Sequence, residues 1–261
     1  MILVFDVGNT ETTVGLFDGD ELAAHWRLTT GVTRTPDEYA VLLHSLLHLS
    51  GVDRSRVRGG AVGSVVPPVT QPLSDGFRDL VGAPPLVVDG SSPLGITLDV
   101  DEPRTVGADR IINTLAASRM YGRDTIAVDL GTATTYDCIT ADGVFLGGVI
   151  QPGVLTSAET LFRRTSKLPA TELVPPLRVI GRRTEECIRA GVLYGAAESI
   201  DGIVRRIKAE WPRPGVAPLV IATGGLAETL KAHCRELDRV EPFLTLHGLR
   251  IAHGILAPGS P

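Results

Sequence analysis

The stretch Ile2-Leu3-Val4-Phe5-Asp6-Val7-Gly8-Asn9-Thr10-Glu11-Thr12-Thr13 leads from an apolar run directly into a polar turn. A second stretch has the same form: Thr125-Ile126-Ala127-Val128 continues into Asp129-Leu130-Gly131-Thr132-Ala133-Thr134-Thr135. Short continuous apolar runs of this kind predict buried strands of a parallel sheet. A plain turn has no reason to repeat its Asp, so the duplication indicates two related halves that face each other across a polar cleft.

The residues of the first turn suit phosphate chemistry. Asp6 is expected at the carboxyl end of its strand, where open α/β sheets bind ligands, and a carboxylate there can hold a cation beside a phosphate. Gly8 lets the backbone turn tightly and approach a ligand closely. Side chains that can donate to phosphate oxygens follow, together with the N–H groups of the turn: Asn9, Thr10, Thr12 and Thr13.

The plainer interpretation is a pair of β-hairpins. Asp18-Gly19 and Asp142-Gly143 each predict a tight turn between two strands. The expected strands around them are 12–17 with 22–28 and 135–140 with 144–150. The two interpretations are compatible, because a hairpin can be the scaffold while the polar turn at its entrance is the candidate site.

Composition narrows the class of protein. The 261 residues allow one large domain or two of ordinary size, and the net charge of −5 argues against nucleic acid as the main partner. The three cysteines lie far apart without a CxxC, so neither a disulfide framework nor a zinc site is indicated, and a reducing cytosol fits best. The N-terminus lacks the features of a signal peptide, and no apolar run is long enough to span a membrane.

Strands and helices are expected to alternate along the whole chain, which predicts the α/β class. Thr35-Pro36-Asp37-Glu38 has the form of a capping box that starts a helix. Gly122-Arg123-Asp124 is a plausible boundary between two domains. The other expected helices lie near 72–81, 107–121, 156–164, 184–210, 227–235 and 248–257, the other strands at 61–66, 86–89 and 219–222, and a long polar loop at 90–106.

Three widespread motifs are absent: the P-loop GxxxxGK[ST], the Rossmann cofactor motif GxGxxG after a strand, and the hydrolase elbow GxSxG. What remains is a set of strands that end in Asp or Gly, at Asp6, Asp129 and Thr223-Gly224-Gly225. This set resembles the superfamily of sugar kinases, heat-shock protein 70 and actin. The resemblance implies an α/β fold with two ribonuclease-H-like (actin-like ATPase) domains, residues 1–121 and 122–261, and a cleft between them that clamps ATP.

Within that superfamily the chain is most similar to type III pantothenate kinases. Asp6–Thr10 resembles their first phosphate motif, Gly107-Ala108-Asp109-Arg110 their catalytic and substrate motif, and Asp129–Thr135 their second phosphate motif. Further matching positions are Gly147-Gly148, Pro152-Gly153 and Thr184. Each motif alone is weak, but their order and spacing extend over nearly the whole chain.

The resemblance implies a reaction, in which ATP and pantothenate give 4′-phosphopantothenate, the first step of coenzyme A synthesis. It implies that Asp129 holds a monovalent cation, K⁺ or NH₄⁺, and that Mg²⁺ accompanies ATP. It also implies a cytoplasmic homodimer, in which Thr184 reaches the pocket of the neighbouring subunit, with no nucleic acid or membrane partner. The implied ATP contacts are Asp6, Val7, Gly8, Asn9, Thr10, Glu11, Thr12, Thr13 and Thr132, and the implied pantothenate contacts are Gly107, Ala108, Asp109, Arg110 and Thr184.

Elementary chemistry supports these implied roles. A primary alcohol needs a proton acceptor, and the start of a helix stabilises Asp109 as the anion that can accept a hydrogen bond. Phosphoryl transfer has a loose transition state, so orienting the alcohol matters more than deprotonating it early. Arg110 can pair bidentately with the carboxylate of pantothenate. Each residue also has a plainer alternative. Asp109 could be only the N-cap of its helix, and Arg110 only a surface residue. Asp129 could be a turn residue or a water-mediated magnesium contact, and Thr184 an N-cap with Glu186 nearby.

Two positions depart from the family pattern or leave its interpretation open. Val100 lies three residues before Pro103, where many members carry Tyr, so no aromatic wall of the pocket is assigned. Glu11 adds a negative charge to the first turn and either faces away from the nucleotide or helps to hold magnesium. The competing functions are another small-alcohol kinase or phosphatase of the superfamily, and a non-catalytic regulator that keeps the nucleotide fold.

Overall fold

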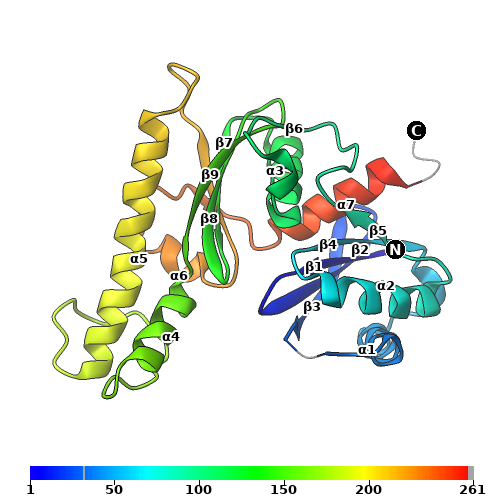
Figure 1. Cartoon of the computed structure of the whole chain (residues 1–261), viewed down its shortest axis with the longest axis horizontal. Coiled ribbons are helices and arrows are strands. Elements are labelled where there is room, and N and C mark those ends of the chain that lie inside the picture. Colours follow the sequence, from blue (N-terminus) through cyan, green and yellow to red (C-terminus); the bar gives the residue numbers. More distant parts are fainter. Residues whose placement is uncertain (32, 258–261) are drawn as a thin grey trace. The chain divides into compact units, whose positions relative to one another are not determined.

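A computed structural model describes residues 1–31 and 33–257, shown in Figure 1. Two compact units are present. The first contains residues 1–120, 143–145 and those from 244 onward, and the second contains residues 121–142 and 146–243. Strands and helices alternate in both, as the sequence predicts. The predicted division into two ribonuclease-H-like domains, residues 1–121 and 122–261, stays a prediction.

A five-stranded sheet forms the centre of the first unit. Its strand order is β3-β2-β1-β4-β5, with β1 and β2 antiparallel, β2 and β3 antiparallel, and the remaining pairs parallel. Gly19 adopts a φ of +62° in the predicted tight turn between β2 and β3. The strands are β1 Ile2–Val7, β2 Glu11–Asp18, β3 Glu21–Thr29, β4 Gly59–Ser64 and β5 Leu86–Val88.

Helices α1 (Pro36–Leu49) and α2 (Pro67–Val81) pack on one face of this sheet. Their apolar side chains form a buried core with alternate residues of β1 and β2. The predicted capping box is present, because the N–H of Glu38 donates to Thr35 Oγ1 at 3.3 Å and the N–H of Thr35 donates to Glu38 Oε2 at 2.7 Å. Both helix starts therefore follow local signals, a capping box for α1 and the Pro67-Pro68 pair for α2.

Helices α3 (Ala108–Tyr121) and α7 (Leu244–Leu256) pack against the opposite face. A Cβ atom on Gly63 of β4 would overlap Ile112 Cδ1 of α3. A Cβ atom on Gly248 of α7 would lie 2.5 Å from the carbonyl oxygen of Ile112. The two glycines therefore allow α3 to contact both β4 and α7 at van der Waals distance.

The predicted loop at 90–106 contains two short elements. Strand β6 (Thr97–Leu98) pairs in parallel with the first residues of β9, Val144 and Phe145, and a 3₁₀ turn spans Pro103–Thr105. Another 3₁₀ turn spans Arg54–Arg56. The remainder of the segment is irregular, as the sequence predicts.

In the second unit the strands β11, β10, β7, β8 and β9 are neighbours in that order. Strands β7 and β8 are antiparallel, whereas β10 runs parallel to both β7 and β11. The long helix α5 supplies much of the buried core through Leu193, Ala197 and Ile200. The elements are β7 Thr125–Leu130, β8 Ala133–Ile139, β9 Val144–Pro152, β10 Leu219–Thr223, β11 Arg239–Val240, α4 Val154–Arg164, α5 Thr184–Ala209 and α6 Ala227–Lys231.

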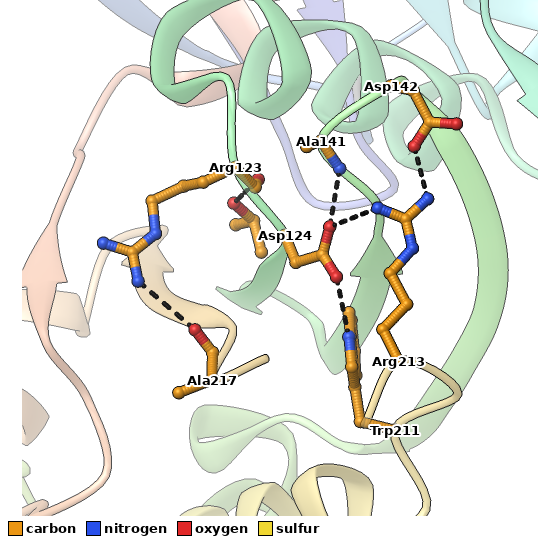
Figure 2. A network of polar contacts seen from close by, with 8 residues as sticks. Arg123, Asp124, Ala141, Asp142, Trp211, Arg213 and Ala217 are labelled. Carbon is orange, nitrogen blue, oxygen red and sulfur yellow. Dashed lines mark hydrogen bonds and ion pairs between the residues drawn. The ribbon is translucent and has the colours of Figure 1, made fainter. Parts of the chain in front are cut away.

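A buried carboxylate holds the amino end of β7 (Figure 2). Asp124 accepts hydrogen bonds from Trp211 Nε1 at 2.8 Å, from Arg213 Nη1 at 2.9 Å and from the N–H of Ala141 at 2.9 Å. Arg213 also donates to Asp142 at 2.6 Å, and this hydrogen bond lowers the pKa of Asp142 to about 2. The network lies at the end of β7 remote from Asp129 and is structural.

Three helix boundaries differ from the sequence prediction by four or five residues. Helix α2 begins at Pro67 rather than near Pro72, α6 ends at Lys231 rather than Arg235, and α7 begins at Leu244 rather than near Gly248. Over the described residues, no helix is both long enough and apolar enough to cross a membrane.

Candidate active site

The first phosphate turn connects β1 to β2. Asp6 lies next to the end of β1, opposite Thr13 of β2 and Gly63 of β4 in the strand register. The N–H of Gly8 donates to the carbonyl oxygen of Glu11 at 3.0 Å and closes the turn. Asn9 and Thr10 are exposed at its tip, whereas Val7 is buried in the core. The turn therefore presents polar groups to solvent at the carboxyl end of β1.

The side chains that follow the turn alternate between the two faces of the sheet. Thr13 shares the face of Asp6, because the two residues are directly paired. Thr12 belongs to the opposite face, where it is buried and its hydroxyl lies 2.8 Å from that of Thr30. Glu11 is exposed, and its carboxylate lies 3.8 Å from Arg27 Nη1 on β3. Glu11 thus pairs with an arginine of the neighbouring strand.

The candidate catalytic residue lies in the first turn of α3. The helix begins at Ala108, and the N–H of Ile111 donates to the carbonyl oxygen of Gly107 at 3.2 Å, so Gly107 takes the cap position. Asp109 is half-buried, and its Oδ1 accepts from the N–H of Arg110 at 2.9 Å. The alternative in which Asp109 is the N-cap of this helix is therefore not observed, and its carboxylate lies beside the positive end of the helix dipole.

Contacts within the first unit bring this helix start to the Asp6 turn. Ile112, one turn after Asp109, fills the space above Gly63, which is the register partner of Asp6. Val65, which follows β4, donates its N–H to the carbonyl oxygen of Val7 at 3.1 Å. A Cβ atom on Gly107 would lie 3.6 Å from the side chain of Val65. The phosphate turn and the catalytic motif therefore lie at the same edge of the first sheet.

Arg110 has an aromatic neighbour that the sequence did not indicate. Its guanidinium carbon lies 5.0 Å from the ring centroid of Phe145, within cation–π distance, and Phe145 is buried. A planar guanidinium held over a ring keeps a fixed orientation, which suits bidentate recognition of a carboxylate. The sequence offered no signal for this pairing, because Phe145 lies 35 residues further along the chain.

In the second unit, Asp129 lies near the end of β7, paired with Thr135 of β8 and Thr223 of β10. Gly224 follows β10 with a φ of +89°. A Cβ atom on Gly224 would lie 2.9 Å from Asp129 Oδ1 and 2.8 Å from the carbonyl oxygen of Leu130. A carboxylate and a carbonyl oxygen thus flank one residue without a side chain, a donor set that suits a hard cation.

Thr132 lies in the exposed turn between β7 and β8. The N–H of Gly131 donates to the carbonyl oxygen of Ala133 at 3.1 Å, which closes the turn. The carbonyl oxygen of Thr132 accepts from the N–H of Gly153 at 3.1 Å and from Thr156 Oγ1 at 2.7 Å. The second phosphate motif and the Pro152-Gly153 motif are therefore in direct contact.

Thr184 is the first residue of α5, and Arg183 precedes it at the cap position. The alternative of Thr184 as the N-cap is therefore not observed, and the carboxylate of Glu186 accepts from the N–H of Arg182 at 2.8 Å. Thr184 borders a hollow of about 620 Å³ between α4 and α5. Small and apolar side chains of these helices line much of it, including Val154, Leu161, Ile188, Gly191 and Gly195.

Within the described part of the chain, no three His, Cys, Asp or Glu side chains gather as a metal-binding group. Magnesium that accompanies a nucleotide needs no such group, since it is held by one or two carboxylates together with phosphate oxygens and water. Asp6 on the first unit and Asp129 on the second are carboxylates at the carboxyl ends of central strands, the place where this class of fold binds ligands.

Solved structures with the same fold define the class of this protein. A conserved putative Baf family transcriptional activator from Campylobacter jejuni is 17% identical, has a TM-score of 0.58 and matches 96% of each chain. A putative 2-dehydro-3-deoxygalactonokinase from Sinorhizobium meliloti is 13% identical, has a TM-score of 0.56 and matches 99% of this chain and 100% of that one. The predicted α/β fold of the actin-like ATPase and sugar kinase type is confirmed.

Sequence comparison gives the family. The family model of type III pantothenate kinase matches residues 2–206. Proteins named type III pantothenate kinase from Moorella thermoacetica and Syntrophotalea carbinolica are 43% and 47% identical over 253 residues, 97% of this chain and 98% of each relative. The chain belongs to the type III pantothenate kinase family, and the resemblance inferred from its motifs is confirmed.

Proposed function

We propose that this protein transfers the terminal phosphoryl group of ATP to the primary alcohol of pantothenate, giving 4′-phosphopantothenate for coenzyme A synthesis. Family membership supplies the reaction. The observation that carries it to this chain is the position of Asp109, in the first turn of a helix that Gly63 allows to pack beside Asp6. The candidate proton acceptor and the candidate phosphate turn thus belong to the same compact unit.

Asp109 accepts the proton of the attacking alcohol. Its carboxylate lies at the amino end of α3, where it can accept a hydrogen bond from the alcohol. Because the transition state is loose, the larger contribution of Asp109 is to aim the alcohol oxygen at the phosphorus atom. Full proton transfer follows as the new P–O bond forms.

Arg110 binds the carboxylate of pantothenate. Its guanidinium, oriented over Phe145, presents two parallel N–H donors to the two carboxylate oxygens. Gly107 and Ala108 bring their backbone to the same position, where a side chain on Gly107 would overlap Asp109. Thr184 adds a hydroxyl hydrogen bond to the same substrate from the start of α5, in the pocket of the neighbouring subunit.

ATP is held by the Asp6–Thr13 turn and by Thr132. The exposed Asn9 and Thr10 donate to phosphate oxygens, as do the N–H groups of the turn. Thr12 contributes through its backbone, since its hydroxyl is engaged with Thr30. Asp6 would hold magnesium together with the phosphates, and the ion would supply positive charge beside the phosphate oxygens.

Asp129 is the ligand of a monovalent cation, K⁺ or NH₄⁺. The carbonyl oxygen of Leu130 lies on the same side of Gly224 as the Asp129 carboxylate and supplies a second oxygen atom. Oxygen ligands suit hard cations, and the family resemblance implies that this one is monovalent. The function of the cation is to lower the negative charge beside ATP.

The homodimer is the functional unit and works in the cytoplasm, where ATP is available. Apolar side chains are exposed on α4 and on the segment that follows it, among them Leu155, Phe162, Leu177 and Ile180. Several large apolar side chains exposed within one segment of the chain favour a protein–protein interface. Sedimentation equilibrium tests this part, and Ile180→Asp is expected to shift the protein toward monomer and to lower activity.

A coupled assay that follows ADP formation tests the function. Pantothenate should support turnover in the presence of Mg²⁺ and K⁺, whereas pantetheine and sugars in the same panel should distinguish other small-alcohol kinases. Turnover of a sugar without turnover of pantothenate would contradict the proposal. Replacing K⁺ by Na⁺ should lower the rate, and Asp129→Ala should remove both the cation dependence and most of the activity.

Asp109→Asn should lower kcat by about 10²- to 10⁴-fold, the usual contribution of a general base. Its affinity for ATP should remain that of the wild type, because the change removes only the proton acceptor. Wild-type turnover by Asp109→Asn would show that the proton acceptor is a different residue.

A further inference from the structure

The turn that carries Thr132 is attached to helix α4 by two hydrogen bonds to one oxygen. The carbonyl oxygen of Thr132 accepts from the N–H of Gly153, the cap residue of α4, at 3.1 Å. It also accepts from the hydroxyl of Thr156, in the first turn of α4, at 2.7 Å. The second of these contacts spans 24 residues of sequence, and Thr156 lies outside the family motifs named above.

The hydroxyl of Thr156 is used differently from those of comparable threonines. A helical Thr commonly donates to the carbonyl oxygen four residues earlier, as Thr160 does to Thr156 at 2.8 Å and Thr165 does to Leu161 at 2.7 Å. Thr156 has no helical residue four positions before it, because α4 begins at Val154. Its hydroxyl is therefore available to hold a different segment, and it holds Thr132.

The backbone on the other side of the contact leaves the turn little room to move. A Cβ atom on Gly153 would lie 2.7 Å from the carbonyl carbon of Thr132 and would overlap the carbonyl oxygens of Gly131 and Thr132. The turn thus cannot approach α4 further, and the hydrogen bond from Thr156 opposes its movement away. Thr132 itself is exposed, so packing from the solvent side does not fix it.

We propose that Thr156 is a positioning residue for ATP, which acts by holding the carbonyl oxygen of Thr132 and hence the orientation of the turn toward the phosphates. The inference rests on the proposed function, in which Thr132 contacts ATP. A turn held at one oxygen by a main-chain donor and a hydroxyl keeps its geometry before the nucleotide arrives, so less ordering is needed when ATP binds.

The same helix also borders the hollow beside Thr184. Val154 and Ser157, on either side of Leu155 and Thr156, both line that hollow. A general displacement of α4 would therefore change the binding of both substrates. Loss of the Thr156 hydroxyl alone should change the binding of ATP and leave that of pantothenate unchanged, which separates positioning from simple structural damage.

The test compares Thr156→Val, which removes the hydroxyl at constant shape, with Thr156→Ser, which keeps it. Thr160→Val is the matched control, because Thr160 lies one turn further along α4 and its hydroxyl bonds only within the helix. The steady-state kcat and the KM for each substrate are measured on the full-length protein, with thermal unfolding as a check of folding. ATP affinity is also measured directly by calorimetry without pantothenate.

Thr156→Val should raise the KM and the dissociation constant for ATP by about 5- to 10-fold, the loss expected for one hydrogen bond. The KM for pantothenate should stay within about twofold of the wild type, the size of an ordinary surface effect. Thr156→Ser should recover most of the loss, and Thr160→Val should match the wild type in every measurement.

Unchanged ATP affinity in Thr156→Val, or an equal rise in both KM values, would overturn the inference. So would a Thr160→Val variant that behaves like Thr156→Val. Absence of pantothenate-dependent turnover in the wild type would instead reject the proposed function, and the calorimetric comparison would still test the positioning of ATP by Thr156.

Discussion

Gly63 of the first sheet lies directly against Ile112 of helix α3, and Gly63→Ala tests that contact. The new methyl group would overlap Ile112 Cδ1 and would lie 3.3 Å from Leu249 Cδ2. Both neighbours are fully buried, so Ile112 must leave its rotamer or α3 must shift. Overpacking of this kind costs about 1–3 kcal/mol of unfolding free energy.

Ile112→Val provides the matched compensation, because it removes the Cδ1 atom that the new methyl group would meet. Alone it should cost about 0.5–1.5 kcal/mol, the usual value for Ile→Val at a buried site. In the double variant the alanine methyl group fills the space that Cδ1 has left. The combined cost should therefore be smaller than the sum of the single costs by about 1–2 kcal/mol.

Urea unfolding of the four proteins measures this coupling, and the coupled kinase assay measures its effect on activity. Since Asp109 lies one turn before Ile112, Gly63→Ala should also lower kcat/KM, by up to about 10²-fold for a displacement near 1 Å. The double variant should recover most of that loss. Strictly additive unfolding free energies would refute the reasoning, because they would mean that Ile112 does not occupy the space above Gly63.

Three further variants test other parts of the structure. Gly153→Ala should lower kcat/KM for ATP by about 10- to 100-fold, because its methyl group would meet backbone atoms of Thr132 that cannot rotate away. A wild-type value would contradict the close approach of Gly153 to Thr132. Trp211→Phe should lower the unfolding free energy by about 1.5–3 kcal/mol, because buried Asp124 loses a hydrogen bond; an unchanged urea midpoint would show that this bond adds nothing. Burial lowers the pKa of His253 below its ordinary 6.5, so the unfolded state takes up the proton first as the pH falls. The free energy of unfolding should therefore fall as the pH drops through about 6.5. The variant His253→Gln should lack that part of the loss when its free energy of unfolding is measured between about pH 7.5 and 5.5.

Elements with local signals could be predicted from the sequence, and those set by distant contacts could not. Helix α1 begins at its capping box, whose members are three residues apart. Gly248 suggested a helix start, but it lies inside α7, where its missing side chain lets the helix contact the backbone of Ile112. Helix α6 ends at Lys231, and the N–H groups of Arg235 and Glu236, where the sequence predicted its end, donate to the distant Asp201 on α5.

The same distinction applies to the candidate site. The sequence placed Asp6 and Asp129 at the ends of their strands, because an apolar run followed by a polar turn is a local pattern. It placed Asp109 at the start of a helix, as observed. The partners of these motifs depend on which strand or helix lies opposite. Neither the pairing of Glu11 with Arg27 nor that of Thr132 with Thr156 has a signal at short sequence separation.

The position of α7 has a consequence for the synthesis of the protein. This helix is the last described element of the chain, yet it packs on the first strand and on β4. During translation the apolar residues that α7 covers on the first sheet therefore stay exposed until residues near 256 have left the ribosome. The elements of the second unit are synthesised before the first unit can close, so a nascent chain stalled before α7 would present that face to chaperones and proteases.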